Sequence, residues 1–114
     1  DVAKALAAGA DAVMLGGMLA SCIEAPGHVK EVDGVKLKQF RGMASASAGS
    51  RYVEGAEGWV VCDTDVGSVM TSISNGLQSA MSYVGASKLH EFRENARFVQ
   101  VSHTSMKENG AHAY

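Results

Sequence analysis

The sequence has few of the residues that mark several protein classes. Its 114 residues include only two Cys and one Pro, and ten Lys and Arg stand against twelve Asp and Glu. Two cysteines are too few for a disulfide framework or a zinc site, which is typical of a reducing compartment. Without a surplus of basic residues, general nucleic-acid binding is disfavoured, because phosphates must be neutralised by Lys and Arg.

Long apolar runs are also missing. No run approaches the roughly 20 apolar residues that cross a bilayer, and the first ten residues have neither the basic start nor the unbroken apolar centre of a signal peptide. Hydrophobic residues nevertheless make up 46% of the chain, which is ordinary for a globular protein. We therefore expect a folded cytoplasmic protein with neither nucleic acid nor membrane as a partner.

Residues 1–27 have the order of elements found in a (β/α) barrel. A helix capped by Asp1 and ended by Gly9 is predicted first, with Val2 and Leu6 on its apolar face. Residues 12–15 are then continuously apolar, which is typical of a strand buried on both faces of a parallel sheet. A glycine pair and a second helix follow. The chain offers few parallel neighbours for such a strand, so the fold class expected is α/β, as the closing part of a barrel.

The glycine pair, Gly16-Gly17, has two interpretations on sequence physics alone. Its backbone N–H groups are placed at the end of a strand and the start of a helix, where phosphates bind in such barrels. A tight turn that merely needs small residues is equally consistent with the pattern, since a bare glycine pair is a weak motif.

Residues 28–65 have a different residue pattern from residues 1–27, with turn signals and small residues. Asp33-Gly34 predicts the turn of a hairpin over residues 28–38. Its packed side is expected to hold Val29, Val32, Val35 and Leu37. Residues 41–50 are small and aperiodic, which predicts a mobile loop, either a linker or an active-site flap. Residues 51–58 are expected to be a solvated loop.

Residues 66–114 are predicted to be mainly helical. Apolar residues recur at three- and four-residue steps from Val66, and Gly85 is placed to end that helix. Ser87 is placed to cap a further helix, in which Phe92 belongs to the buried face. A short strand is expected over residues 98–101, followed by an irregular polar tail. Both Cys22 and Cys62 are interpreted as packing residues rather than reactive thiolates.

Taken together, several strings resemble the IMP dehydrogenase and GMP reductase family. In chain order they are AGADAVMLGGMLA, EAPG, DGVKLKQFRGMASASA, RY, EGAEG and GLQSAMSYVGAS. The resemblance runs from Asp1 to the end of the chain. It implies the C-terminal part of a (β/α)8 barrel with a flap and a C-terminal segment, usually in a tetramer, acting on a purine nucleotide with a nicotinamide cofactor.

The resemblance also implies roles for matching residues in binding IMP or GMP. Gly16 and Gly17 would hold the phosphate through backbone N–H groups, which favours the functional interpretation of the pair. Gly42 and Met43 would contact the hypoxanthine ring through their backbone. Glu54 would accept hydrogen bonds from the ring nitrogens.

Further roles are implied for the flap and the tail. Arg51 and Tyr52 resemble the pair that, in the dehydrogenases, activates the water that hydrolyses a covalent nucleotide intermediate. Such a role for a guanidinium requires a strongly depressed pKa. Glu108, Asn109 and Gly110 resemble the stretch whose backbone carbonyls help to bind potassium across a subunit interface, and hard oxygen ligands suit that ion.

Some features depart from the family pattern. Phe40 stands where many dehydrogenases have a Tyr whose hydroxyl contacts the phosphate, and only ten residues separate Met43 from Glu54. The nucleophilic cysteine of the family lies on an earlier loop that this sequence lacks. We therefore expect the chain to be catalytically incomplete by itself, with the upstream portion of the enzyme as its partner.

Three hypotheses stay open. The first and favoured one is part of an NAD-dependent IMP dehydrogenase, supported by the EAPG, RGM, Arg51-Tyr52 and ENG strings. The second is part of an NADPH-dependent GMP reductase, supported by the short flap and the GGMLA and YVGAS strings. The third is a non-catalytic derivative that binds nucleotide or completes an assembly.

Overall fold

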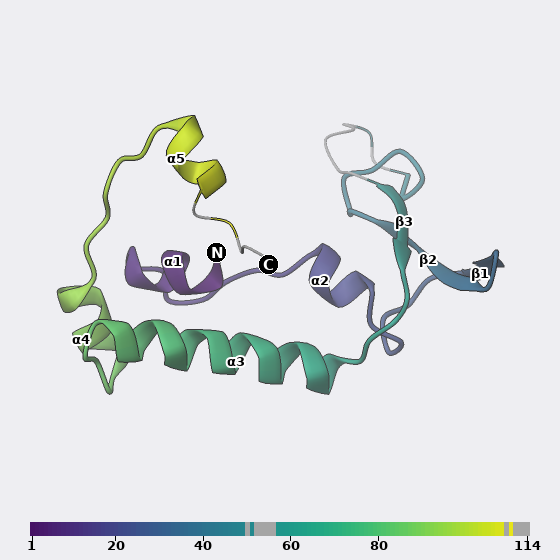
Figure 1. Ribbon diagram of the computed structural model, residues 1–114. Helices are drawn as coiled ribbons and strands as arrows, with labels where there is room; N and C mark the ends of the chain where they lie inside the picture. The colour runs from purple at the N-terminus through teal and green to yellow at the C-terminus, as the bar shows by residue number, and fades with distance from the viewer. Residues whose placement is uncertain (50, 52–56, 109, 111–114) are drawn as a thin grey trace.

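The structure, a computed structural model, describes residues 1–49, 51, 57–108 and 110. A helical region and a three-stranded sheet lie at opposite ends of the long helix α3 (Figure 1). The elements in chain order are α1 (Val2–Ala7), α2 (Gly17–Ala20), β1 (Val29–Val32), β2 (Val35–Arg41), β3 (Glu57–Val61), α3 (Val66–Tyr83), α4 (Leu89–Asn95) and α5 (His103–Glu108).

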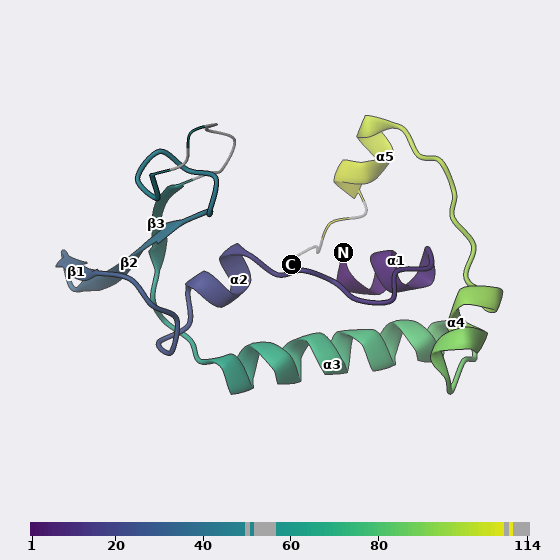
Figure 2. The same ribbon diagram turned by 180° about the vertical axis from the view of Figure 1, so that it is seen from behind.

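Two helix predictions are confirmed in the helical region. Helix α1 begins after Asp1 and is followed by Gly9 at a φ of 113°. Helix α3 ends just before Gly85, whose φ is 68°. There the Ala86 N–H donates to the Met81 carbonyl and the Gly85 N–H donates to the Ser82 carbonyl, a paired arrangement that closes a helix end. Figure 2 shows α1 lying along α3, with α4 beside the end of α3.

The helix predicted to begin at Ser87 begins one residue later. Lys88 is the N-cap of α4, and the Ser87 N–H donates to the Glu91 carboxylate at 3.2 Å. The carboxylate therefore reaches back around the first turn, as in a capping box shifted by one position. Phe92 is buried as predicted, whereas Leu89 is 42% exposed.

The hairpin prediction is confirmed, and its packed side is not. Strands β1 and β2 pair antiparallel around Asp33-Gly34, both of which have positive φ. The three valines of the expected packed side are 44–53% exposed, whereas Lys38 is 2% exposed. The prediction was wrong because the chain that covers β2 presents backbone carbonyls, and carbonyls need a hydrogen-bond donor rather than an apolar side chain.

Strand β3 corrects the expected loop at Glu57 and Gly58, and it continues to Val61, for which no element was predicted. It pairs antiparallel with β2, placing Gln39 opposite Trp59, and completes the order β1-β2-β3. The run Trp59-Val60-Val61 favours a strand, but the glycines and charges before it dominated the pattern. Ser45, in the expected mobile loop, is fully buried within a series of turns.

Two further strands were predicted wrongly. Residues 12–15 and 98–101 lie outside every strand of the structure, and Met14 and Val99 are 97% and 79% exposed. A strand needs a neighbour to satisfy its backbone N–H and C=O groups, and no neighbouring strand accompanies either segment within the described residues. The tail, expected to be irregular, instead forms α5.

The apolar core is small. Among the described residues, the buried apolar side chains are Cys22 and Phe92. Large apolar side chains remain exposed over much of the surface, including Met18 and Phe98 at 49% and 62%. A surface of this kind is typical of an interaction site. No helix in the described part of the chain is long and apolar enough to cross a membrane.

Candidate functional site

A pocket of about 730 Å³ lies between the segment around α2 and the end of β2. It brings together three of the residues that the sequence analysis selected for substrate binding: Gly16, Gly17 and Gly42. Its lining consists of Gly16, Gly17, Leu19, Ala20, Ala25, Pro26, Gly27, His28, Gln39, Phe40, Arg41 and Gly42.

One wall of the pocket exposes bare backbone. Gly16 is the N-cap of α2, and its carbonyl accepts from the N–H groups of Leu19 and Ala20. A Cβ atom added at Gly16 or Gly17 would meet nothing within 4 Å. The first N–H groups of a helix have no acceptor within the helix. This wall can therefore receive a ligand that brings hydrogen-bond acceptors close to the backbone.

The opposite wall is the end of β2 and the turn that follows it. The Arg41 guanidinium donates to the Ser47 carbonyl, and the buried Ser45 hydroxyl donates to the Gly42 carbonyl at 2.6 Å. The Ser47 N–H donates to the Glu57 carboxylate at 3.1 Å, and hydrogen bonding from Ser47 lowers the pKa of Glu57. These contacts fold the turn back on β2 and β3.

The charge of the lining favours an anionic ligand. Arg41 supplies a positive charge, and the His28 imidazole adds a further polar group to the lining. Among the described residues of the lining there is no Asp or Glu. The pocket thus combines exposed glycine backbone on one wall with a cation on the other, which suits a phosphate-bearing ligand.

The other predicted site residues are placed differently. Met43 follows Gly42 in the chain but is 95% exposed and outside the lining. Arg51 is exposed beyond the turn that contains Ser47. Tyr52 and Glu54 lie outside the described residues, so their predicted roles stay predictions.

The predicted potassium ligands are described only in part. The backbone of Glu108 ends α5 and Gly110 is exposed, while Asn109 lies outside the described residues. In the part of the chain that is described, no group of three His, Cys, Asp or Glu side chains could hold a metal ion. Because the predicted ligands are backbone carbonyls, that result leaves the potassium prediction as it was.

Cys22 behaves as a packing residue, as predicted. Its thiol is buried and donates to the Met18 carbonyl at 3.5 Å. Burial raises the pKa of the Cys22 thiol, and the carboxylates of Glu24 and Asp65 raise it further. A thiol held protonated in this way is a poor nucleophile.

Sequence reasoning missed three residues at the pocket. His28 and Gln39 belong to the lining, and the buried Lys38 donates to the carbonyl of Ala25, which also lines the pocket. The hairpin signal located β2, but its alternation did not reveal which face another segment covers. Lys38 stands between Leu37 and Gln39, so the neighbouring residues carried no signal of its burial.

Three comparisons bear on the family. A model described as "IMP dehydrogenase / GMP reductase domain" matches residues 1–112. GMP reductase of Leishmania donovani is 38% identical, with 98% of this chain and 26% of that protein covered. The IMP dehydrogenase of Methanocaldococcus jannaschii is 39% identical, with 98% of this chain and 27% of that protein covered.

One solved structure is also similar to this chain. It is a GMP reductase variant from Trypanosoma brucei in complex with guanosine 5'-monophosphate, with a TM-score of 0.88 and 42% identity, covering 99% of this chain and 25% of that one. The chain thus spans about a quarter of the length of the relatives it matches.

Proposed function

The chain belongs to the IMP dehydrogenase and GMP reductase family of oxidoreductases, and we propose that it is the C-terminal part of the catalytic barrel of an IMP dehydrogenase. In this role it takes part in oxidising IMP to XMP with NAD in guanine nucleotide synthesis. The observation that carries the proposal is the pocket that joins Gly16-Gly17 to Arg41-Gly42.

The pocket supports a nucleoside monophosphate as the ligand. Under the proposal, the N–H groups of Gly16 and Gly17 bind the phosphate, where the open backbone favours an anion. The purine ring then extends toward Gly42 and Met43, and Glu54 binds its ring nitrogens. The Trypanosoma brucei relative, solved with guanosine 5'-monophosphate, supports a purine nucleotide of this size.

The chemistry is divided between this chain and the rest of the enzyme. The nucleophilic cysteine belongs to the upstream portion, and NAD accepts the hydride when bound. Arg51 and Tyr52 then activate the water that releases XMP. The exposure of Arg51 supports access of its side chain to solvent. Backbone carbonyls at Glu108, Asn109 and Gly110 contribute to a potassium site.

The exposed apolar surface supports the upstream portion as a partner. Met14 and Val99 come from the two segments predicted as strands, and both are largely exposed. The chain spans about a quarter of its relatives, so the remaining part of a barrel domain is large enough to cover this surface. In the complete barrel, residues 12–15 gain the strand neighbours that they lack here. We propose a homotetramer of such barrels, in the cytoplasm.

A second function, GMP reductase with NADPH, is favoured by one observation. The Trypanosoma brucei GMP reductase is 42% identical to this chain over nearly its whole length. In that case the same pocket binds GMP, and the flap supports deamination instead of hydrolysis.

The test uses the parent protein, meaning the natural polypeptide that carries this sequence, supplemented with any separately encoded upstream portion. Formation of NADH from IMP and NAD is measured beside oxidation of NADPH by GMP. IMP-dependent NADH formation supports the proposal, whereas activity with GMP and NADPH alone assigns the reductase. Nucleotide binding without either activity leaves the non-catalytic alternative.

Arg51 provides a sharper test of the dehydrogenase. Arg51→Ala is expected to lower steady-state turnover at least about a hundredfold while the first hydride transfer, seen as a burst of NADH, is kept. Arg97→Ala is the matched control, because Arg97 is exposed and its guanidinium bonds only to nearby carbonyls among the contacts described. Loss of the burst in Arg51→Ala would argue against a role confined to hydrolysis.

A further inference from the structure

The Lys38 ammonium group is buried and donates hydrogen bonds to three backbone carbonyls. Only 2% of the residue is exposed. Its Nζ atom donates to the carbonyl oxygens of Cys22 at 2.5 Å, Ile23 at 3.1 Å and Ala25 at 2.7 Å. An ammonium group has three donors, so these three acceptors offset the cost of removing it from water.

The three carbonyls belong to the segment that becomes one wall of the pocket. Residues 25–28 line the pocket immediately after the contacts of Lys38, and residues 39–42 line it from β2 immediately after Lys38 itself. Lys38 therefore joins the two walls at the point where both enter the pocket.

Two further contacts continue this junction. The Gln39 N–H donates to the His28 carbonyl at 2.9 Å. Gly27 has a φ of 130°, and a Cβ atom there would lie 2.3 Å from the Gln39 carbonyl oxygen. The walls are thus in backbone contact, and Lys38 is the side chain that holds their separation.

The segment is also anchored on its other side. The Ile23 N–H donates to the Thr64 carbonyl at 2.9 Å, and the Glu24 carboxylate accepts from the Val66 N–H at 3.1 Å. These contacts attach residues 22–25 to the start of α3, independently of β2. Removing the ammonium of Lys38 therefore takes away three hydrogen bonds between β2 and a segment that stays in place, and leaves the Gln39–His28 backbone hydrogen bond to hold the spacing of the walls.

We infer that Lys38 is a positioning residue for the nucleotide: it sets the distance between the Gly16-Gly17 wall and the Arg41-Gly42 wall. The inference rests on the proposed function, since it assigns the nucleotide to this pocket. Lys38 itself is buried behind the lining and acts through the backbone of its neighbours. A ligand that contacts both walls is bound more weakly when their spacing varies.

The test compares Lys38→Met with Lys36→Met in the parent protein, supplied with its upstream portion if that is separate. Lys36 is exposed on the same strand. Lys38→Met is expected to raise the Kd for IMP or GMP, measured by calorimetry, and the nucleotide KM by about tenfold. The KM for the dinucleotide and kcat should change less than about threefold. Lys38→Arg, which keeps the charge and the donors, should recover most of the nucleotide affinity.

A purely structural role gives a different result. It lowers the amount of folded enzyme, and hence the apparent kcat, but leaves the Kd and KM of the folded molecules unchanged; that result overturns the inference. If Lys38→Met does not fold, Lys38→Gln, which has a shorter side chain with two donors, takes its place with the same criterion. If the unsubstituted protein binds neither IMP nor GMP, the proposed function fails; if it binds and Lys38→Met binds equally well, only the inference fails.

Discussion

In the pocket region and in the helical region alike, a cation joins two separate segments by donating to backbone carbonyls. Lys38 joins β2 to residues 22–25 and is almost completely buried, at 2% exposure. Arg93 joins α4 to α1 and its side chain is 34% exposed. Both contacts are hydrogen bonds from a cation to backbone carbonyls, but water can replace the lost donor only at Arg93. Burial therefore decides which of the two contacts is rigid.

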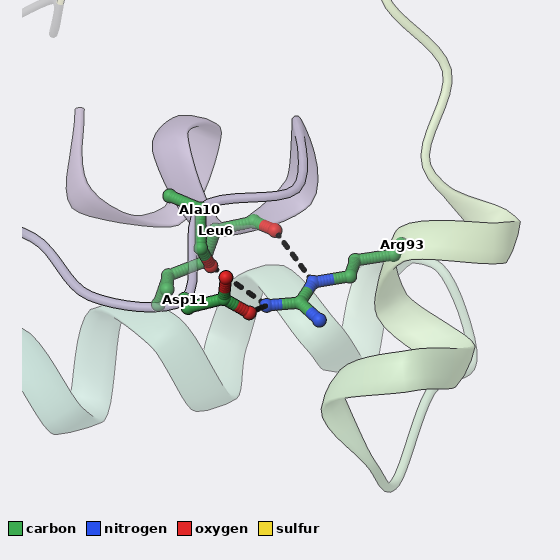
Figure 3. Close-up of polar contacts among 4 residues, drawn as sticks. All are labelled: Leu6, Ala10, Asp11 and Arg93. Atoms are coloured by element: carbon green, nitrogen blue, oxygen red, sulfur yellow. Dashed lines mark hydrogen bonds and ion pairs between the residues drawn. The ribbon is translucent and has the colours of Figure 1, made fainter.

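Figure 3 shows the helical counterpart in detail. The Arg93 guanidinium donates to the Leu6 carbonyl at 3.3 Å and to the Ala10 carbonyl at 2.7 Å, and it lies 3.7 Å from the Asp11 carboxylate. The Leu6 carbonyl lies in the last turn of α1, where it also accepts from the Gly9 N–H, and the Ala10 carbonyl lies in the segment just after the helix. Arg93 thus caps α1 from a helix that is distant in the sequence.

Loss of the buried cation has the largest expected effect. Lys38→Met should lower the free energy of unfolding by about 3 kcal/mol, because three buried carbonyls lose their donor together. Urea unfolding of the parent protein measures the change. Lys36→Met is the control and should leave the midpoint nearly unchanged; equal effects of the two variants would contradict the contrast drawn from burial.

Loss of the half-exposed cation is expected to cost less. Arg93→Met should lower the free energy of unfolding by about 1.5 kcal/mol. The cost is smaller because water can reach the Leu6 and Ala10 carbonyls once the guanidinium is removed. The same urea experiment applies, with Arg97→Met as a control for the loss of a positive charge. A cost equal to that of Lys38→Met would mean that exposure does not separate the two contacts.

The junction between the two regions should respond to pH. Asp65 caps α3, and hydrogen bonds from the Ser68 N–H and hydroxyl lower its pKa below the ordinary value. Its contribution to stability is therefore complete above the pKa of an unfolded Asp, near 4, and is lost as the pH falls through the lower folded value.

Asp65→Asn isolates this contribution. Asn also caps helices, so the variant should show a smaller loss of Tm than Arg93→Met at pH 7. Below about pH 4 its Tm should fall less steeply than that of the unsubstituted protein. Identical acid profiles for the two proteins would show that another group controls the response.

The smallest effect is expected for the ion pair. Asp11 is 98% exposed and 3.7 Å from the Arg93 guanidinium, and exposed pairs of this kind contribute little. Asp11→Asn should leave the urea midpoint unchanged within error at 0.15 M salt. A measurable loss would show that the contact of α4 with α1 depends on charge as well as on the two carbonyls.

Elements whose signals are local were predicted well from the sequence. Helix α3, its end before Gly85 and the turn at Asp33-Gly34 follow from periodicity and from residues that tolerate positive φ. The glycines of the pocket were also selected, and Gly16, Gly17 and Gly42 do meet in one cavity. In each case the informative residues lie within a few positions of the structure that they determine.

Features that depend on distant neighbours were not predicted. Residues 12–15 have the composition of a buried strand, yet no strand lies beside them in the part of the chain that the structure describes. Lysine is usually a surface residue, yet Lys38 is buried, because residues 22–25 bring three carbonyls to it. The type of a residue gives only its tendency to be buried or to form a strand, and the segment that packs against it decides the outcome.

The sequence by itself determined the family, helices α1 to α4, the hairpin turn and three glycines of the pocket, since these depend on short-range backbone preferences and on motifs. The tertiary structure alone decided which face of β2 is covered, which cations are buried and how the two walls of the pocket are joined. Those outcomes depend on hydrogen bonds between segments 13 to 87 positions apart, and the energy of such a bond is set by burial, which no single segment of sequence contains.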